Sequence, residues 1–142
     1  MYNEMNYNLT WSVPLSKKII LVDDSKTILA TAQIALESLV EDGTIELSIY
    51  TNPIELRDAL INGTEDYDLL VSDINMPQLN GLDLASQLKQ LSNFKNKPIL
   101  ILTTESSAEM KKRGRAIGVT GWLVKPFSDV KLEKAIKMVL GI

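Results

Sequence analysis

The chain contains no cysteine and no histidine among its 142 residues. These absences exclude disulfides, thiolate metal sites, zinc sites with imidazole ligands and imidazole catalysis. No apolar run approaches the roughly 18 residues that a membrane-spanning helix needs, and no secretory leader is evident, so we expect a cytoplasmic protein. Any chemistry must therefore come from carboxylates, hydroxyls, lysines and backbone amides.

The sequence does have enough apolar residues to build a core, since 45% are hydrophobic and 23% are charged. A chain of this length predicts one domain. Its charge is divided: residues 1–87 carry 4 basic and 14 acidic side chains, whereas residues 88–142 carry 11 basic and 4 acidic ones. This division favours an ion-binding site and a charged partner surface, and an ordinary solvated surface is the alternative interpretation.

The first 17 residues differ in composition from the rest. They hold three Asn, two Tyr and one Trp, and only Glu4 and Lys17 are charged. We interpret residues 1–17 as a loosely ordered N-terminal tail and residues 18–142 as the folded domain.

From Lys18 onward, short apolar runs alternate with amphipathic segments. The expected strands are 19–22, 45–50, 69–71, 98–102 and 121–124, and the expected helices are 26–40, 53–62, 81–91, 107–117 and a last helix capped by Ser128. Apolar strands that alternate with helices predict a parallel sheet covered on both faces. The expected fold is therefore α/β: a doubly wound, five-stranded, flavodoxin-like (βα)5 sheet with strand order 2-1-3-4-5.

Polar residues follow the strands at the edge where sheets of this kind bind ligands. They are Asp23 and Asp24 after strand 1, Asp73 and then Asn75 after strand 3, Thr103 and Thr104 at strand 4, and Lys125 after strand 5. Because strands 1 and 3 are neighbours, the three aspartates should share one site. Close carboxylates repel each other unless a cation intervenes, and Mg²⁺ prefers oxygen ligands of this kind. Together with Lys125 and the threonine hydroxyl, a cation bound by the aspartates could stabilise a phosphoryl group, so the site is suited to phosphoryl transfer.

The full set of motifs resembles the receiver domain of two-component response regulators. The matching stretches are Asp23-Asp24, Asp73-Ile-Asn-Met-Pro-Gln-Leu-Asn-Gly81, Thr103 and Lys125-Pro126-Phe127, and the likeness runs from about Lys18 to Gly141. Within the family, the stretch 121–127 is most similar to the single-domain regulators of chemotaxis. The resemblance implies a phosphoacceptor that assists its own phosphotransfer and dephosphorylation, and not an enzyme acting on a separate substrate.

The resemblance also implies a role for each matched residue. Asp73 would accept the phosphoryl group, and Lys125, the Thr103 hydroxyl and the Thr104 amide would bind its oxygens. Asp24, Asp73 and the Asn75 carbonyl would bind Mg²⁺ directly, with Asp23 acting mostly through a water molecule. Trp122 would be the switch aromatic, and Asn75 and Glu105 would set the phosphoryl lifetime. The Lys125-Pro126 peptide would be cis.

The implied partners are a histidine kinase as phosphodonor, a flagellar motor switch protein or other target peptide, and a phosphatase. We expect a monomer that binds neither nucleic acid nor membrane. A phosphate sink without a motor target, or a single-domain receiver outside chemotaxis, remains the alternative. A phosphatase of the haloacid dehalogenase type is disfavoured because Asn75 stands where that family has a second aspartate. A flavin binder is disfavoured because Asp23 and Asp24 would repel the flavin phosphate.

Overall fold

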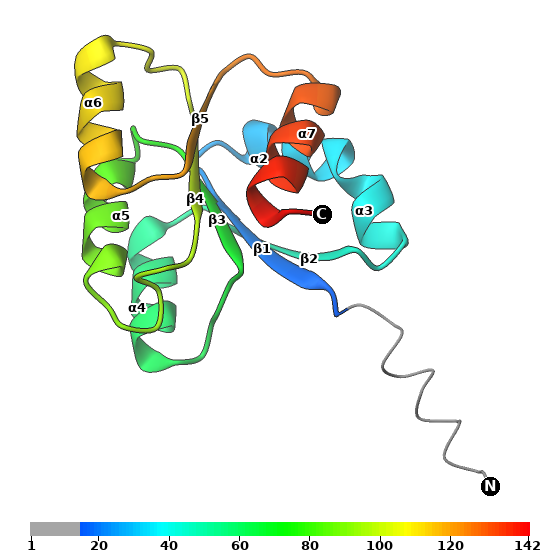
Figure 1. The fold of residues 1–142 in the computed structure, drawn as a ribbon, viewed down its shortest axis with the longest axis horizontal. Helices are drawn as coiled ribbons and strands as arrows, with labels where there is room; N and C mark the ends of the chain where they lie inside the picture. The colour runs from blue at the N-terminus through cyan, green and yellow to red at the C-terminus, as the bar shows by residue number, and fades with distance from the viewer. Residues whose placement is uncertain (1–14) are drawn as a thin grey trace, which may run out of the picture.

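The computed structural model describes residues 15–142, so most of the predicted N-terminal tail lies outside the described residues. Within these described residues, five strands alternate with helices (Figure 1). In order, the elements are β1 (Lys17–Val22), α2 (Lys26–Ala35), α3 (Glu37–Glu41), β2 (Ile45–Tyr50), α4 (Pro53–Asn62), β3 (Leu69–Ser72), α5 (Gly81–Lys89), β4 (Ile99–Thr103), α6 (Ala108–Ile117), β5 (Gly121–Val124) and α7 (Asp129–Leu140). Strand β1 thus begins one residue before the expected start of the folded domain.

The strands form one sheet in the order β2-β1-β3-β4-β5, and every neighbouring pair is parallel. This confirms the predicted doubly wound α/β fold and its strand order. Where β1 meets β3, Val22 pairs with Ser72. That register brings the residues that follow the two strands to the same edge of the sheet.

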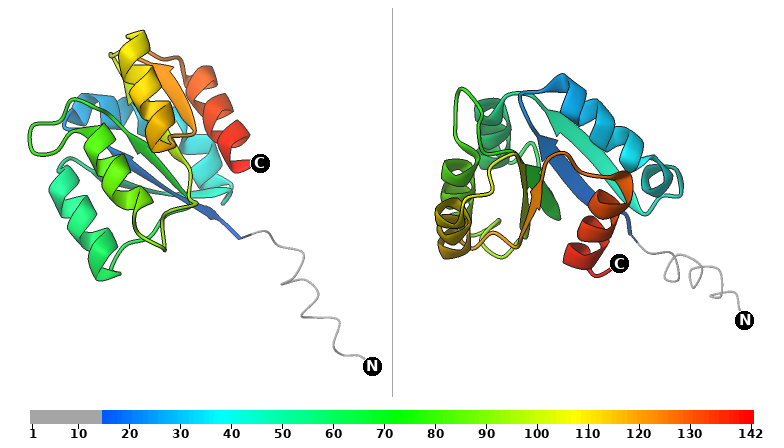
Figure 2. Two further views of the ribbon diagram at one scale, coloured as in Figure 1. Left: turned by 60° about the vertical axis from the view of Figure 1, so that its left-hand side comes forward. Right: turned by 90° about the horizontal axis from the view of Figure 1, so that it is seen from above.

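Each face of the sheet has its own hydrophobic core, because successive residues of a strand point to opposite faces. In β1, Ile20 belongs to the core beneath α4 and α5, whereas Ile19 belongs to the core beneath α2, α3 and α7. Figure 2 shows helices on both sides of the sheet. Both isoleucines are 0% exposed, which explains why the central strands are apolar throughout.

The element bounds differ from the prediction at several places. The predicted helix 26–40 is wrong as a single element, because α2 ends at Ala35 and α3 starts at Glu37. At Leu36 the backbone N–H reaches the carbonyls of both Ala32 and Gln33, so the helical turn tightens there. Helix α5 ends at Lys89, two residues earlier than expected. None of the helices in the described part of the chain is long and apolar enough to cross a membrane.

Candidate functional site

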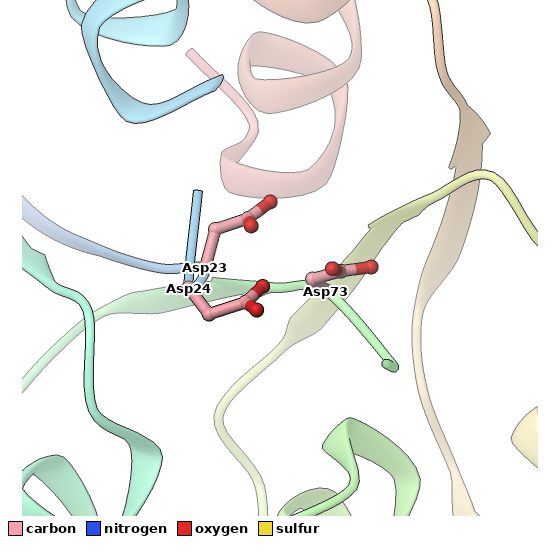
Figure 3. A group of neighbouring side chains, drawn as sticks. All are labelled: Asp23, Asp24 and Asp73. Atoms are coloured by element: carbon pink, nitrogen blue, oxygen red, sulfur yellow. The ribbon is translucent and has the colours of Figure 1, made fainter. Parts of the chain in front are cut away.

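Three carboxylates gather at the carboxyl edge of the sheet, as the sequence predicted. One carboxylate oxygen from each of Asp23, Asp24 and Asp73 lies within 4.8 Å of the others. Figure 3 shows two of these side chains coming from the end of β1 and the third from the end of β3. The Asp73 N–H donates to the Val22 carbonyl at 3.1 Å, which continues the β1–β3 ladder by one residue and holds the cluster in place.

The cluster is buried on one side and open on the other. Asp23 is 4% exposed and Asp73 7% exposed, whereas Asp24 faces solvent. Burial raises the pKa of the Asp23 carboxyl above its ordinary value of 3.8, outweighing the hydrogen bonds from Lys125 and from the Ser25 N–H. The site therefore holds closely spaced acidic groups that a cation entering from the Asp24 side would stabilise.

Lys125 places a positive charge in this site. Its Nζ lies 2.6 Å from Asp23 Oδ2 and 3.5 Å from Asp73 Oδ2. The Lys125 N–H donates to the Thr103 carbonyl at 2.8 Å, so the chain leaves β5 still attached to the end of β4. The Lys125-Pro126 peptide is cis, as the resemblance implied.

Thr103, the last residue of β4, and Thr104, which follows it, occupy different environments. Thr103 is 0% exposed, and its Oγ1 accepts a hydrogen bond from the Glu105 N–H at 3.3 Å. Thr104 is exposed and Glu105 is half-buried. The hydroxyl of Thr103 thus lies inside the edge of the sheet, while the segment that follows is open to solvent.

The loop after β3 places Asp73 through backbone contacts. Asp73 Oδ1 accepts from the Ile74 N–H at 2.8 Å, and the Ile74 carbonyl accepts from the Gly81 N–H at 2.8 Å. A Cβ on Gly81 would lie 1.8 Å from the Asp73 carbonyl oxygen. The sequence identified Gly81 as the residue that opens α5, but only the structure shows that its role is to let α5 approach Asp73. Asn75 belongs to this loop and is exposed.

Trp122 lies on β5, where its indole is half-buried. Its Nε1 donates to the Glu105 carbonyl at 2.9 Å. The sequence singled out both residues but did not predict that they bond each other. It also missed Gly114, which is buried in α6 against the Trp122 ring. A glycine inside a predicted amphipathic helix was the available signal.

The donor set fits Mg²⁺. The three clustered side chains are all carboxylates, and hard divalent cations prefer oxygen ligands. Asp23, Asp24 and Asp73 can supply these oxygens, and the Asn75 carbonyl follows Asp73 closely in the same loop. The sequence contains no cysteine or histidine that would favour a softer metal.

Comparisons with known proteins agree with this geometry. Residues 19–137 match the model of the response regulator receiver domain. The chain is 33% identical over 124 residues to the chemotaxis protein CheY1 of Helicobacter pylori, covering 87% of this chain and 97% of that protein. It is 32% identical over 120 residues to the protein PilG of Pseudomonas aeruginosa, covering 84% of each. A solved structure of the chemotaxis protein CheY4 of Vibrio cholerae is similar, with 36% identity, a TM-score of 0.75 and coverage of 88% of this chain and 99% of that one. The chain therefore belongs to the family of response regulator receiver domains of two-component signalling.

Proposed function

We propose that the protein accepts a phosphoryl group on Asp73 from a histidine kinase and thereby changes its affinity for a partner in chemotaxis. The observation that carries the proposal is the convergence of the three carboxylates with Lys125 at one edge of the sheet. The relatives named for chemotaxis support the biological setting. We further propose that the protein acts in the cytoplasm as a monomer.

In the proposed reaction, an Asp73 carboxylate oxygen attacks the phosphorus of a phosphohistidine on the kinase. A P–O bond forms and the P–N bond to the imidazole breaks, and the imidazole leaves with the electron pair. Lys125 Nζ, already 3.5 Å from Asp73 Oδ2, would stabilise the phosphoryl oxygens together with the Thr103 hydroxyl and the Thr104 amide. Mg²⁺ held by the aspartates and the Asn75 carbonyl would neutralise charge on the same oxygens.

The lifetime of the phosphoryl group depends on access for water. Asn75 is exposed and Glu105 is half-buried, and these residues follow Asp73 and Thr103 by two positions. Neither closes the site with a large apolar side chain. We expect a lifetime of seconds to a few minutes, and a separate phosphatase could shorten it by using the same open side.

The partner surface would involve α6, β5 and α7, all within the basic part of the chain. Lys112, Lys131 and Lys134 are exposed on these helices. Such a surface fits an acidic and partly apolar peptide, such as a segment of a flagellar motor switch protein. The charges would speed association at low salt.

Phosphorylation by acetyl phosphate tests the proposal directly. Wild-type protein should incorporate phosphate with Mg²⁺ and not in excess EDTA. Asp73→Asn should incorporate none, because the amide is nearly isosteric but is not a nucleophile. Asp83→Asn is the matched control, since Asp83 pairs with Arg113 on the surface and does not belong to the cluster of three aspartates. Equal incorporation by Asp73→Asn and Asp83→Asn would refute the assignment.

A binding measurement then distinguishes a regulator of the flagellar motor from a phosphate sink or a receiver with another target. If phosphorylated protein binds a motor switch peptide more tightly than unphosphorylated protein, it is a motor regulator. If phosphorylation proceeds but neither form binds the peptide, the protein acts as a phosphate sink or serves another target.

A further inference from the structure

Gly114 lies inside helix α6, where its Cα faces the ring of Trp122. A Cβ at this position would lie 2.9 Å from Cζ3 and 3.4 Å from Cε3 of the ring, and 3.1 Å from a methyl group of Val119. A separation of 2.9 Å is shorter than Cβ atoms adopt, so the ring would have to move. Glycine weakens a helix interior relative to alanine. Its presence here makes room for the indole.

The indole is bonded to the segment that follows β4. Trp122 Nε1 donates to the Glu105 carbonyl at 2.9 Å, and the Glu105 N–H donates to Thr103 Oγ1 at 3.3 Å. Glu105 therefore bonds the Trp122 ring through its carbonyl and the buried Thr103 hydroxyl through its backbone N–H. A hydroxyl has one proton to donate and two lone pairs. Because Thr103 Oγ1 accepts from Glu105, its own proton is available to a group on Asp73.

We propose that Gly114 is a positioning residue: it holds the Trp122 indole in the orientation that bonds Glu105, and through Glu105 it orients the Thr103 hydroxyl. The orienting role rests on the proposed phosphoacceptor function, whereas the packing of Gly114 against Trp122 does not. The ring also borders a surface cavity of about 200 Å³ lined by Lys111, Arg115 and Val119 among others. A ring pushed away from Gly114 has space there, at the cost of the bond to Glu105.

The packing is tested by a thermal double-mutant cycle. In the wild-type background, Gly114→Ala should lower the Tm despite the better helix propensity of alanine. In a Trp122→Phe background the smaller ring relieves the contact, and the same substitution should raise the Tm by about 3 °C. Ala116→Gly is the matched control, because Ala116 is exposed on the same helix. It should lower the Tm by a similar amount in both backgrounds.

The position of the ring is read by fluorescence. The chain has two tryptophans, so a Trp11→Phe background leaves Trp122 as the reporter. Gly114→Ala in that background should shift the emission of Trp122 to longer wavelength, because the ring moves toward solvent. Ala116→Gly should leave the emission unchanged.

The effect on the site is read with Mg²⁺ and beryllofluoride, a phosphoryl mimic, from the Tm rise that they produce. Gly114→Ala should weaken the apparent affinity about 5-fold, a coupling of ordinary size. Trp122→Phe should weaken it similarly, and the double variant should be no weaker than Trp122→Phe alone, since both changes break one chain of contacts.

Two results would overturn the proposal. If Gly114→Ala raises the Tm equally in both backgrounds, the glycine makes no room for the ring. If Gly114→Ala lowers the Tm in the wild-type background and raises it in the Trp122→Phe background, but leaves the affinity for beryllofluoride unchanged, the ring does not orient Thr103. If Mg²⁺ and beryllofluoride do not raise the Tm of the wild-type protein, that result contradicts the phosphoacceptor assignment instead. The thermal double-mutant cycle then still decides whether Gly114 accommodates the Trp122 ring.

Discussion

Replacing Gly81 by alanine is the most demanding test of how the site is built. The added Cβ would lie 1.8 Å from the Asp73 carbonyl oxygen, 2.8 Å from its carbonyl carbon and 3.0 Å from the Ile74 Cα. All three are backbone atoms, so no side chain can rotate away. An ordinary C···O contact is about 3.3 Å, and the two segments must therefore separate by about 1.5 Å.

Two effects of this substitution oppose each other. Alanine has the better helix propensity, by up to about 1 kcal/mol. Overpacking in a rigid environment costs about 3 kcal/mol or more. The steric effect wins, so we expect Gly81→Ala to lose about 2–3 kcal/mol of unfolding free energy, seen as a Tm lower by about 10 °C. A movement of about 1 Å at the nucleophile should also slow phosphorylation about 100-fold.

Urea unfolding and acetyl phosphate labelling measure these two losses separately. Gly43→Ala is the control: Gly43 has φ of 79° with no atom within 4 Å of an added Cβ, and it precedes β2 at the opposite end of the sheet. It should lose about 1 kcal/mol for the left-handed backbone and label normally. If Gly81→Ala unfolds and labels like the wild type, the close approach of α5 to Asp73 does not position the nucleophile.

Other perturbations test the charges. Lys125→Met should tighten Mg²⁺ binding several-fold in a titration, because a cation is removed from the site, while slowing Asp73 labelling; unchanged Mg²⁺ affinity would argue against the observed ion pairs. Without Mg²⁺, the raised pKa of Asp23 favours the protonated folded state, so its contribution to stability is present below pH about 4 and is lost as the pH rises through the raised value. The difference in unfolding free energy between wild type and Asp23→Asn should therefore change across that window, and saturating Mg²⁺ should oppose the loss; a pH-independent difference contradicts the assignment. Reversing Lys112 and Lys134 to Glu should slow partner association at least several-fold at low salt and leave Asp73 labelling intact, and an unchanged association rate would place the partner surface elsewhere.

The strand order and the clustering of the three aspartates were predictable from the pattern of apolar strands and the rules for parallel sheets. The apolar runs in β1 and β3 are long enough to mark buried strands, and parallel sheets bring the ends of such strands to one edge. Asp23 and Asp73 could therefore be placed together from sequence. The single helix predicted over residues 26–40 was wrong, because the buried Ala32, Leu36 and Leu39 keep a helical spacing across the tightened turn at Leu36.

What the tertiary structure alone decided is which atoms pair. The sequence placed Lys125 near the aspartates, but only the structure shows its ammonium group 2.6 Å from the carboxylate of Asp23, 102 positions away along the chain. The bond from Trp122 to the Glu105 carbonyl, and the glycines that let α5 approach Asp73 and α6 approach Trp122, depend on the fit between individual atoms. Hydrophobic periodicity determines which faces of the elements are buried, and it carries no information at that scale. The sequence by itself therefore placed the three aspartates and Lys125 at one edge of the sheet, whereas packing of the folded chain decided how each of them is held.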